Sequence, residues 1–255
     1  MSFYKYEGRT FIFNGIKNYS EIFSDPIFIK SIYNTTFITI FSVVVILTLS
    51  ILTASFIIDR DRKTRSFLMG IFFLPAVTLA VTICIVWKLI YSASNGILNQ
   101  FLNLFGIGNI NWLGSQETAL PVIVTIMVYV MIGAPIILYT AAMGAIPKSY
   151  YEIAEIEGAN YFQKLRGITI PLIKPTTLYL TVILTISLFQ SFVIVKLMTG
   201  GGPYYRTTTI AFHLVQTAFW FTKYGLASAI GVLLLIVVAG FTVIQFKLLS
   251  GEIEY

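Results

Sequence analysis

Five long apolar runs, separated by polar segments, constrain this 255-residue chain more than any other feature. A bilayer core about 30 Å thick is crossed by ~20 apolar residues in a helix, and each run reaches that length. The fraction of hydrophobic residues is 57%, against 11% charged, far from the balance of a soluble domain. The sequence therefore predicts one all-α domain, a polytopic transmembrane helical bundle. The expected spans are Thr36–Ile58, Phe67–Tyr91, Ala119–Ala142, Thr176–Met198 and Gly225–Leu248.

The positions of Lys and Arg orient these spans, because cytoplasmic loops carry an excess of the two bases. The larger set follows the first, third and fifth spans, and we expect it to be cytoplasmic. It consists of Arg60, Arg62, Lys63, Arg65, Lys148, Lys164, Arg166, Lys174 and Lys247. This orientation places the C-terminus in the cytoplasm and makes residues 1–35 an extracytoplasmic segment ahead of a membrane domain over residues 36–255. No signal-peptide pattern explains the export of residues 1–35, so we expect a sixth span upstream of Met1.

Composition excludes several classes of function. The formal net charge of +6 comes without a basic face interleaved with stacking aromatics, so we expect no nucleic-acid partner. Cys84 and His213 are the single cysteine and the single histidine, which argues against disulfides within the chain and against a metal site. We expect both side chains to be packing residues, and the spans contain no paired carboxylates or nucleophile–base set for catalysis.

Three features lie between or within the spans. The run of apolar residues from Ile97 to Phe105 predicts a short helix in the outer membrane interface, with Trp112 as an anchor at headgroup depth. Gly133 and Pro135 predict a kink in the third span. After the fourth span, the residues Gly200, Gly201, Gly202 and Pro203 exclude a regular helix. This passage is either a plain outer turn or a loop that lines a solute path or meets an external partner.

The polar stretch Glu152–Pro171 is unlike the rest of the chain. Ser149 and Glu152 have capping-box spacing, which predicts a helix starting at Tyr150. Gly158 predicts a left-handed helix stop, and Asn160 with Gln163 predicts a second cap, so two short helices should bend at Gly158–Ala159. Small residues beside large apolar ones suit insertion into a partner's groove, and the alternative is an amphipathic loop resting on its own bundle. The large residues are Ile153, Ile156, Tyr161 and Phe162.

This stretch resembles the EAA loop of ATP-binding-cassette importer permeases, whose pattern is Glu-Ala-Ala, three residues, Gly, nine residues, Ile, any, Leu-Pro. Here the matching positions hold Glu152-Ile153-Ala154, Gly158 and Ile168-Thr169-Ile170-Pro171. Two positions depart from the pattern, with Ile153 in place of Ala and Ile170 in place of Leu. Phe13–Thr35 and the passage MTGGGPYYRTTT resemble segments of the sugar-type (maltose/glycerol-phosphate-like) subfamily of these inner-membrane permeases, so the resemblance covers nearly the whole chain.

The resemblance implies a permease subunit, not an enzyme, in the cell (inner) membrane. It implies a homologous second permease, a cytoplasmic ATPase dimer and an extracytoplasmic solute-binding protein as partners, besides membrane lipid. The chain itself is expected to bind no cofactor, with ATP and Mg used by the ATPase. The ATPase would dock on a coupling loop at about residues 145–175. Its expected contact residues are Glu152, Ala154, Gly158, Ala159, Ile168 and Pro171, and for Glu152 the alternatives are capping its own helix or a salt bridge to the ATPase.

Solute contacts are sought in the fourth span, which combines hydroxyls and an amide with aromatic rings. The candidates are Ser187, Phe189, Gln190, Ser191 and Lys196. The competing explanations are helix–helix hydrogen bonding for the polar residues and snorkelling to the interface for Lys196. The implied function is import of a mono- or oligosaccharide, or of a sugar or glycerol phosphate, by alternating access.

Two other functions compete with ATP-driven import. An ion-coupled secondary carrier that uses protons usually needs an intramembrane acid, and no Asp or Glu lies within the five expected spans. A carrier that uses sodium through carbonyls and hydroxyls stays open. A non-transporting membrane scaffold would bind partners through the same loop without moving a solute.

Overall fold

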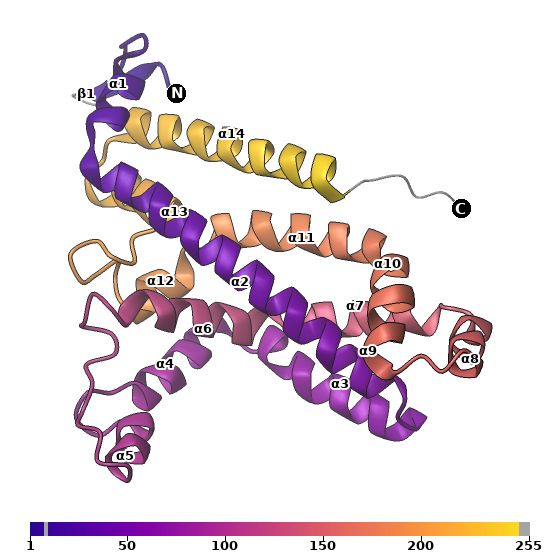
Figure 1. Cartoon of the computed structure of the whole chain (residues 1–255). Helices are drawn as coiled ribbons and strands as arrows, with labels where there is room; N and C mark the ends of the chain where they lie inside the picture. The colour runs from indigo at the N-terminus through magenta and orange to yellow at the C-terminus, as the bar shows by residue number, and fades with distance from the viewer. Residues whose placement is uncertain (8–9, 250–255) are drawn as a thin grey trace. The chain divides into compact units, whose positions relative to one another are not determined.

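The computed structural model describes residues 1–7 and 10–249 and is almost entirely helical (Figure 1). Its described strands, β1 (Tyr4–Glu7) and β2 (Thr10–Phe13), form an antiparallel hairpin. The predicted all-α membrane bundle is thereby confirmed. The described residues form two compact units: the first contains residues 1–7, 10–42, 78–127 and 185–241, and the second contains residues 43–77, 128–184 and 242–249.

The first and fifth predicted spans are single helices. α2 (Pro26–Ile58) begins ahead of the predicted Thr36 and ends at the predicted residue, and α14 (Tyr224–Leu249) matches its prediction within one residue at each end. Within the described residues, these are the two helices that are individually long and apolar enough to cross a membrane. α2 starts early because Asp25 caps it, with Oδ1 accepting a hydrogen bond from the Ile27 amide at 2.8 Å.

The second and third predicted spans are bent helix pairs. α3 (Arg62–Val77) and α4 (Ala80–Ile90) meet at 95°, at a break where Leu79 has extended backbone. α6 (Ala119–Met131) and α7 (Gly133–Gly144) meet at 48°, at the position where Gly133 and Pro135 predict a kink. At the start of α3, Asp61 Oδ2 accepts from the amides of Lys63 and Thr64. Hydrogen bonding with the Thr64 side chain, followed by these amide bonds, lowers the pKa of the Asp61 carboxyl.

The fourth predicted span, Thr176–Met198, is not one continuous helix. α11 (Lys174–Phe189) ends before Gln190, and a separate short helix, α12 (Val193–Met198), follows. The break is stable because the Ser191 carbonyl accepts a hydrogen bond from Thr209 Oγ1 at 3.0 Å. α11 instead pairs, at 69°, with the apolar helical segment Tyr161–Leu172 ahead of it. That segment consists of α9 (Tyr161–Lys164), the π-helical turn η1 (Leu165–Thr169) and α10 (Ile170–Leu172).

The first unit has its core between the N-terminal segment and the helices near the other end of the chain. Ile22 of α1 (Lys17–Ser24) and Phe28 pack with Phe189, Ile210 and Ala229. The remaining elements of this unit are α5, α13 and the π-helical turn η2. Their bounds are Ile97–Asn103, Ile210–Val215 and Gln216–Trp220.

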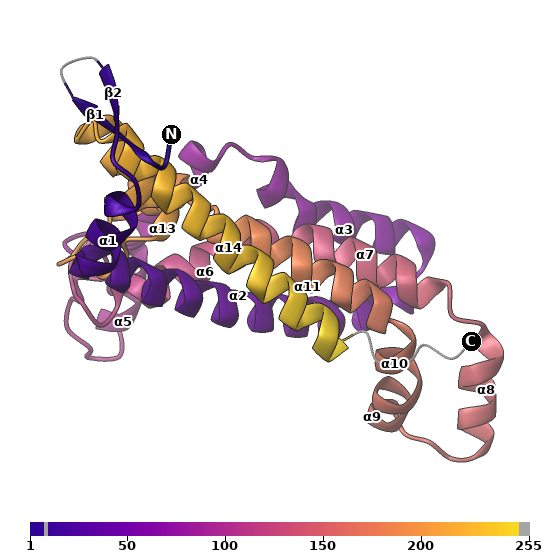
Figure 2. The same cartoon turned by 90° about the horizontal axis from the view of Figure 1, so that it is seen from above.

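The second unit has its own core, in which Ala54, Tyr139, Met143, Ile173 and Leu180 are buried together. In this unit α3 and α7 approach closely: a Cβ atom added at Gly133 would overlap the carbonyl oxygen of Phe72. The unit also contains α8 (Lys148–Ile156), which Figure 2 shows with α9 beyond the end of α7. The coupling-loop candidates therefore all belong to one unit.

Candidate functional site

The first helix of the candidate coupling loop begins differently from its prediction. α8 starts at Lys148, with Pro147 as the N-cap residue and no side-chain cap. The predicted capping box at Ser149 is therefore wrong, because Pro147, with φ of −58° and ψ of 133°, starts the helix two residues earlier, at Lys148. Glu152 is exposed and does not cap α8. Its carboxylate is thus presented to solvent from the middle of the helix.

The helix stop at Gly158 matches its prediction. Gly158 has φ of 78°, a left-handed conformation that glycine adopts at little cost. The Ala159 amide donates to the Ala154 carbonyl at 2.8 Å, and the Gly158 amide donates to the Glu155 carbonyl at 3.0 Å. This pair of bonds is the Schellman motif. Ala154, Gly158 and Ala159 thus close the turn between the two helices.

The second helix has the predicted cap. Asn160 Oδ1 accepts from the Gln163 amide at 3.0 Å, and Gln163 Oε1 accepts from the Asn160 amide at 2.7 Å. Two further side-chain contacts connect the halves of the loop. Lys164 Nζ lies 2.8 Å from Glu155 Oε1, and the hydroxyls of Tyr151 and Thr169 lie 2.9 Å apart. Ile168 lies in η1, and Pro171 lies at the start of α10.

The loop leaves large apolar side chains uncovered. Ile156 is 85% exposed and Phe162 is 73% exposed, and Ile153 is also exposed. They share the segment with the exposed polar residues Glu152 and Gln163, so the surface is amphipathic. Uncovered apolar groups rimmed by polar residues are a feature of protein or membrane interaction sites.

A cavity of about 720 Å³ lies behind the loop, within the second unit. It is lined from the loop by Tyr151, Tyr161 and Thr169, and from the end of α2 by Ser55. Charged side chains of both signs also line it, namely Asp59, Arg65, Lys148, Glu152, Glu155 and Lys164. The loop is thus separated by open space from part of the unit that carries it.

The glycine-rich passage after α12 folds into a loop with hydrogen bonds of its own. Gly200 and Gly201 have φ of 61° and 85°. The hydroxyl of Thr208 donates to the Gly201 carbonyl at 3.0 Å, and that of Thr207 donates to the Gly202 carbonyl at 2.7 Å. Gly201 is buried and Pro203 is partly buried, whereas Gly200 is exposed.

Polar residues of α2 hold this loop, and the sequence analysis missed them. Lys30 Nζ donates to the Tyr204 carbonyl at 2.7 Å, and Asn34 Nδ2 donates to the carbonyls of Tyr205 and Thr208 at 2.9 and 3.0 Å. A detectable signal was present, because Ser31, Thr35, Thr39 and Ser42 repeat at helical spacing with Asn34 inside an otherwise apolar run.

The structure does not gather the candidate solute contacts at one surface. Phe189 is fully buried and packs on Phe241, with ring centroids 5.2 Å apart. Ser191 Oγ contacts Met127 Sδ at 3.3 Å, whereas Gln190 and Lys196 are exposed and Ser187 is partly buried. The Lys196 ammonium lies 5.3 Å from the centroid of the Phe192 ring.

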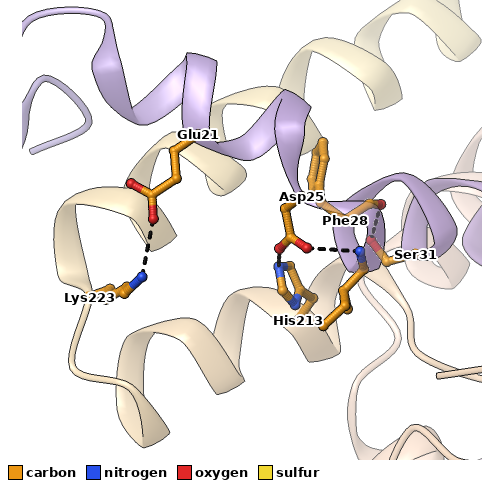
Figure 3. A network of polar contacts seen from close by, with 7 residues as sticks. Glu21, Asp25, Phe28, Ser31, His213 and Lys223 are labelled. Carbon is orange, nitrogen blue, oxygen red and sulfur yellow. Dashed lines mark hydrogen bonds and ion pairs between the residues drawn. The ribbon is translucent and has the colours of Figure 1, made fainter. Parts of the chain in front are cut away.

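The single histidine has a more specific environment than packing alone. His213 is buried, and its Nε2 lies 3.2 Å from Asp25 Oδ2 (Figure 3). Both residues line a cavity of about 240 Å³ beside the exposed ion pair of Lys223 and Glu21, whose charged atoms are 3.1 Å apart.

Cys84 is buried, as expected for a packing residue. Within the described residues, no group of three or more His, Cys, Asp or Glu side chains could hold a metal ion.

Known proteins resemble this chain over most of its length. A trehalose/maltose transport system permease protein of Thermococcus litoralis is 33% identical over 92% of this chain and 79% of its own. A bacterial transporter that imports the acidic polysaccharide alginate has the same fold, with a TM-score of 0.84 at 23% identity over 94% of this chain and 85% of the other.

A bacterial alginate ABC transporter, solved in complex with an alginate pentasaccharide-bound periplasmic protein, gives a TM-score of 0.82 at 24% identity. That match covers 91% of this chain and 82% of the other. The family described as "binding-protein-dependent transport system inner membrane component" matches residues 46–251, which is most of the chain. The chain therefore belongs to the family of inner-membrane components of binding-protein-dependent transport systems.

Proposed function

We propose that this chain is a permease subunit of an ATP-driven importer for a carbohydrate. The observation that carries the proposal is the uncovered amphipathic surface of the segment Glu152–Pro171. Its bend is fixed by the Schellman motif at Gly158, and its apolar side chains Ile153, Ile156 and Phe162 have no cover in the described chain. A rigid, projecting element of this kind suits the groove of an ATPase subunit.

Energy would reach the pore mechanically. The sequence has no G-x-x-x-x-G-K-[ST] phosphate loop, and the nearest string, Gly144–Ser149, lacks the second glycine. ATP and Mg would therefore be used by the ATPase dimer. Closure of that dimer would move the loop of this chain and that of a homologous second permease together, and would switch the pore between inward- and outward-facing states.

The loop must lie in the cytoplasm for this scheme to work. The excess of Lys and Arg beside it supports that orientation, which also places the C-terminus inside. Residues 250–255 themselves lie outside the described residues. The opposite side would then receive solute from an extracytoplasmic binding protein. The structure of a similar alginate transporter in complex with an alginate pentasaccharide-bound periplasmic protein supports this assignment.

The carbohydrate class rests on the relatives. One similar permease belongs to a trehalose/maltose system, and the structurally similar transporter imports alginate. The polar residues Ser187, Gln190 and Ser191 are candidate contacts along the path, and Lys196 is the candidate for an anionic solute such as alginate or a sugar phosphate. The structure offers a competing role for Ser191, whose hydroxyl contacts Met127.

Uptake by vesicles tests the proposal. The chain would be reconstituted with its native partner subunits and binding protein, and supplied with labelled trehalose, maltose or alginate oligosaccharide. Uptake of one solute that requires ATP and Mg on the cytoplasmic face, and persists when ionophores collapse all ion gradients, is expected. Uptake abolished by ionophores with ATP present would identify a secondary carrier, and binding of partners with no uptake would identify a scaffold.

A further inference from the structure

The coupling loop is braced internally, so that it can move as one body. The Schellman motif fixes the turn at Gly158, and the reciprocal bonds of Asn160 and Gln163 fix the start of α9. The Lys164–Glu155 ion pair and the Tyr151–Thr169 hydroxyl contact connect its two arms. Force applied to the exposed face of this segment is therefore transmitted through it rather than absorbed by bending.

The side-chain hydrogen bonding between the loop and the membrane helices is much sparser than the bonding within the loop. The 720 Å³ cavity separates part of the loop from the end of α2 and from α7. Across that space, the Tyr161 hydroxyl donates to Ser55 Oγ at 2.7 Å. This side-chain hydrogen bond joins the segment Lys148–Leu172 to a helix outside it.

Ser55 lies where a displacement of the loop would act on α2. It lies near the C-terminal end of α2, is buried, and donates in turn to the Leu52 carbonyl at 2.9 Å. The Tyr161 hydroxyl, the Ser55 hydroxyl and the Leu52 carbonyl thus form a short hydrogen-bonded chain that ends in the backbone of a membrane span. A displacement of α9 would act on α2 directly through these atoms.

We propose that the Tyr161–Ser55 hydrogen bond is the link that ties movement of the coupling loop to α2, so that Tyr161 and Ser55 are positioning residues for transport rather than docking residues. The inference rests on the proposed docking of an ATPase on this loop. It separates two functions of one segment: the exposed face of the loop binds the ATPase, and the hydroxyl on the cavity side transmits its movement.

Two measurements on the assembled complex, reconstituted in vesicles, test this link. The first is basal ATP hydrolysis with no solute or binding protein present, because an ATPase that no longer has to move α2 should turn over faster. Tyr161→Phe and Ser55→Ala should each raise this rate about fivefold, the factor that corresponds to a hydrogen bond worth ~1 kcal/mol. The double variant should show no further increase, since both changes remove the same bond.

The second measurement is the distance between two spin labels. They would be attached at Leu49→Cys on the exposed side of α2 and at Glu157→Cys in the loop, with Cys84→Ser removing the native thiol. A narrow distribution is expected with Tyr161 and Ser55 intact, and a broad one in Tyr161→Phe and in Ser55→Ala.

Two control variants change the same kinds of side chain but leave the Tyr161–Ser55 hydrogen bond in place. Ser55→Thr retains a hydroxyl and should behave as the unmodified chain in both measurements. Tyr179→Phe removes the same hydroxyl from an exposed tyrosine of α11 and should change neither the hydrolysis rate nor the distance distribution. A normal elution profile of each complex confirms that the variants assemble.

The outcomes distinguish the link from the docking it rests on. Unchanged hydrolysis and an unchanged distance distribution in Tyr161→Phe, with the ATPase still bound, would overturn the link and leave the proposed function intact. Absence of an ATPase from the complex of the unmodified chain would overturn the proposed function itself.

Discussion

Asp25 Oδ2 accepts a hydrogen bond from His213 Nε2 across 3.2 Å, joining the start of α2 to α13 (Figure 3). Because Nε2 carries the proton that it donates, Nδ1 is the unprotonated nitrogen of the neutral ring, and it is buried without a hydrogen-bond partner. Burial lowers the pKa of His213 below its ordinary value, and the carboxylate of Asp25 offsets part of that effect. A proton added to Nδ1 would have no acceptor.

Acidification should therefore destabilise the first unit. Between pH 6.5 and the lower pKa of folded His213, the unfolded chain binds the proton and the folded chain does not. The free energy of unfolding therefore falls by about 1.4 kcal/mol for each unit by which the pH decreases in this range. Cys84 is the single cysteine and is buried, so its reaction with a thiol-reactive dye reports unfolding. The midpoint temperature of that reaction should fall from pH 7.5 to pH 5.5, and the fall should be smaller in His213→Asn. Equal falls in both proteins would contradict this account.

The close approach of α3 and α7 predicts a severe effect at Gly133. Gly133→Ala places a methyl group against the Phe72 backbone, which cannot rotate away as a flexible side chain could. The expected loss is about 2 kcal/mol or more of stability. Gly70→Ala on α3 is the matched control, because its added methyl meets nothing within 4 Å. The heating temperature at which each detergent-solubilised protein loses its monodisperse elution peak measures the difference, and equal temperatures would refute the packing argument.

Asn99 organises the segment between α4 and α6. Its Nδ2 donates to the carbonyls of Ser92, Ala93 and Ile110, and its Oδ1 accepts from the Ile110 amide and from Trp112 Nε1 at 2.8 Å. Asn99→Ala removes the hydrogen-bond partner of all these groups. The free energy of local opening of this segment should therefore fall by about 3 kcal/mol.

Hydrogen exchange at the Ile110 amide measures that local cost. Exchange there should accelerate in Asn99→Ala. It should not change in Asn103→Ala, whose exposed side chain bonds to Asn109. Unaltered exchange in Asn99→Ala would mean that the segment is held by other contacts.

The sequence predicted the helical bundle well because span length and turn chemistry are local properties. The limits of α14 depend on a continuous apolar run, and the Schellman turn depends on Gly158 adopting positive φ. The kink at Gly133 likewise depends on residues at the kink itself. These features need no knowledge of distant parts of the chain.

The wrong capping box at Ser149 has a local cause, the neighbouring Pro147, but the other errors arose where distant residues decide the structure. The fourth span breaks after Phe189, at a site where Thr209 satisfies the exposed carbonyl of Ser191. The burial of Phe189 depends on Phe241, and the Tyr161–Ser55 bond joins residues 106 positions apart. Hydropathy and periodicity carry no information about such partners. The docking role of Glu152 and the other loop residues stays a prediction.

The most direct test of ATP-driven import is co-purification from native membranes in mild detergent. The unmodified chain should retain an ATPase subunit and a second permease, both identified by mass. Gly158→Asp should lose the ATPase, because it strains the left-handed turn and adds a charge to the docking face. Gly106→Asp, at an equally left-handed glycine with open space around it but in the segment between α4 and α6, should retain the ATPase. A chain that purifies with no ATPase, even after cross-linking through Ala154→Cys, would contradict the account.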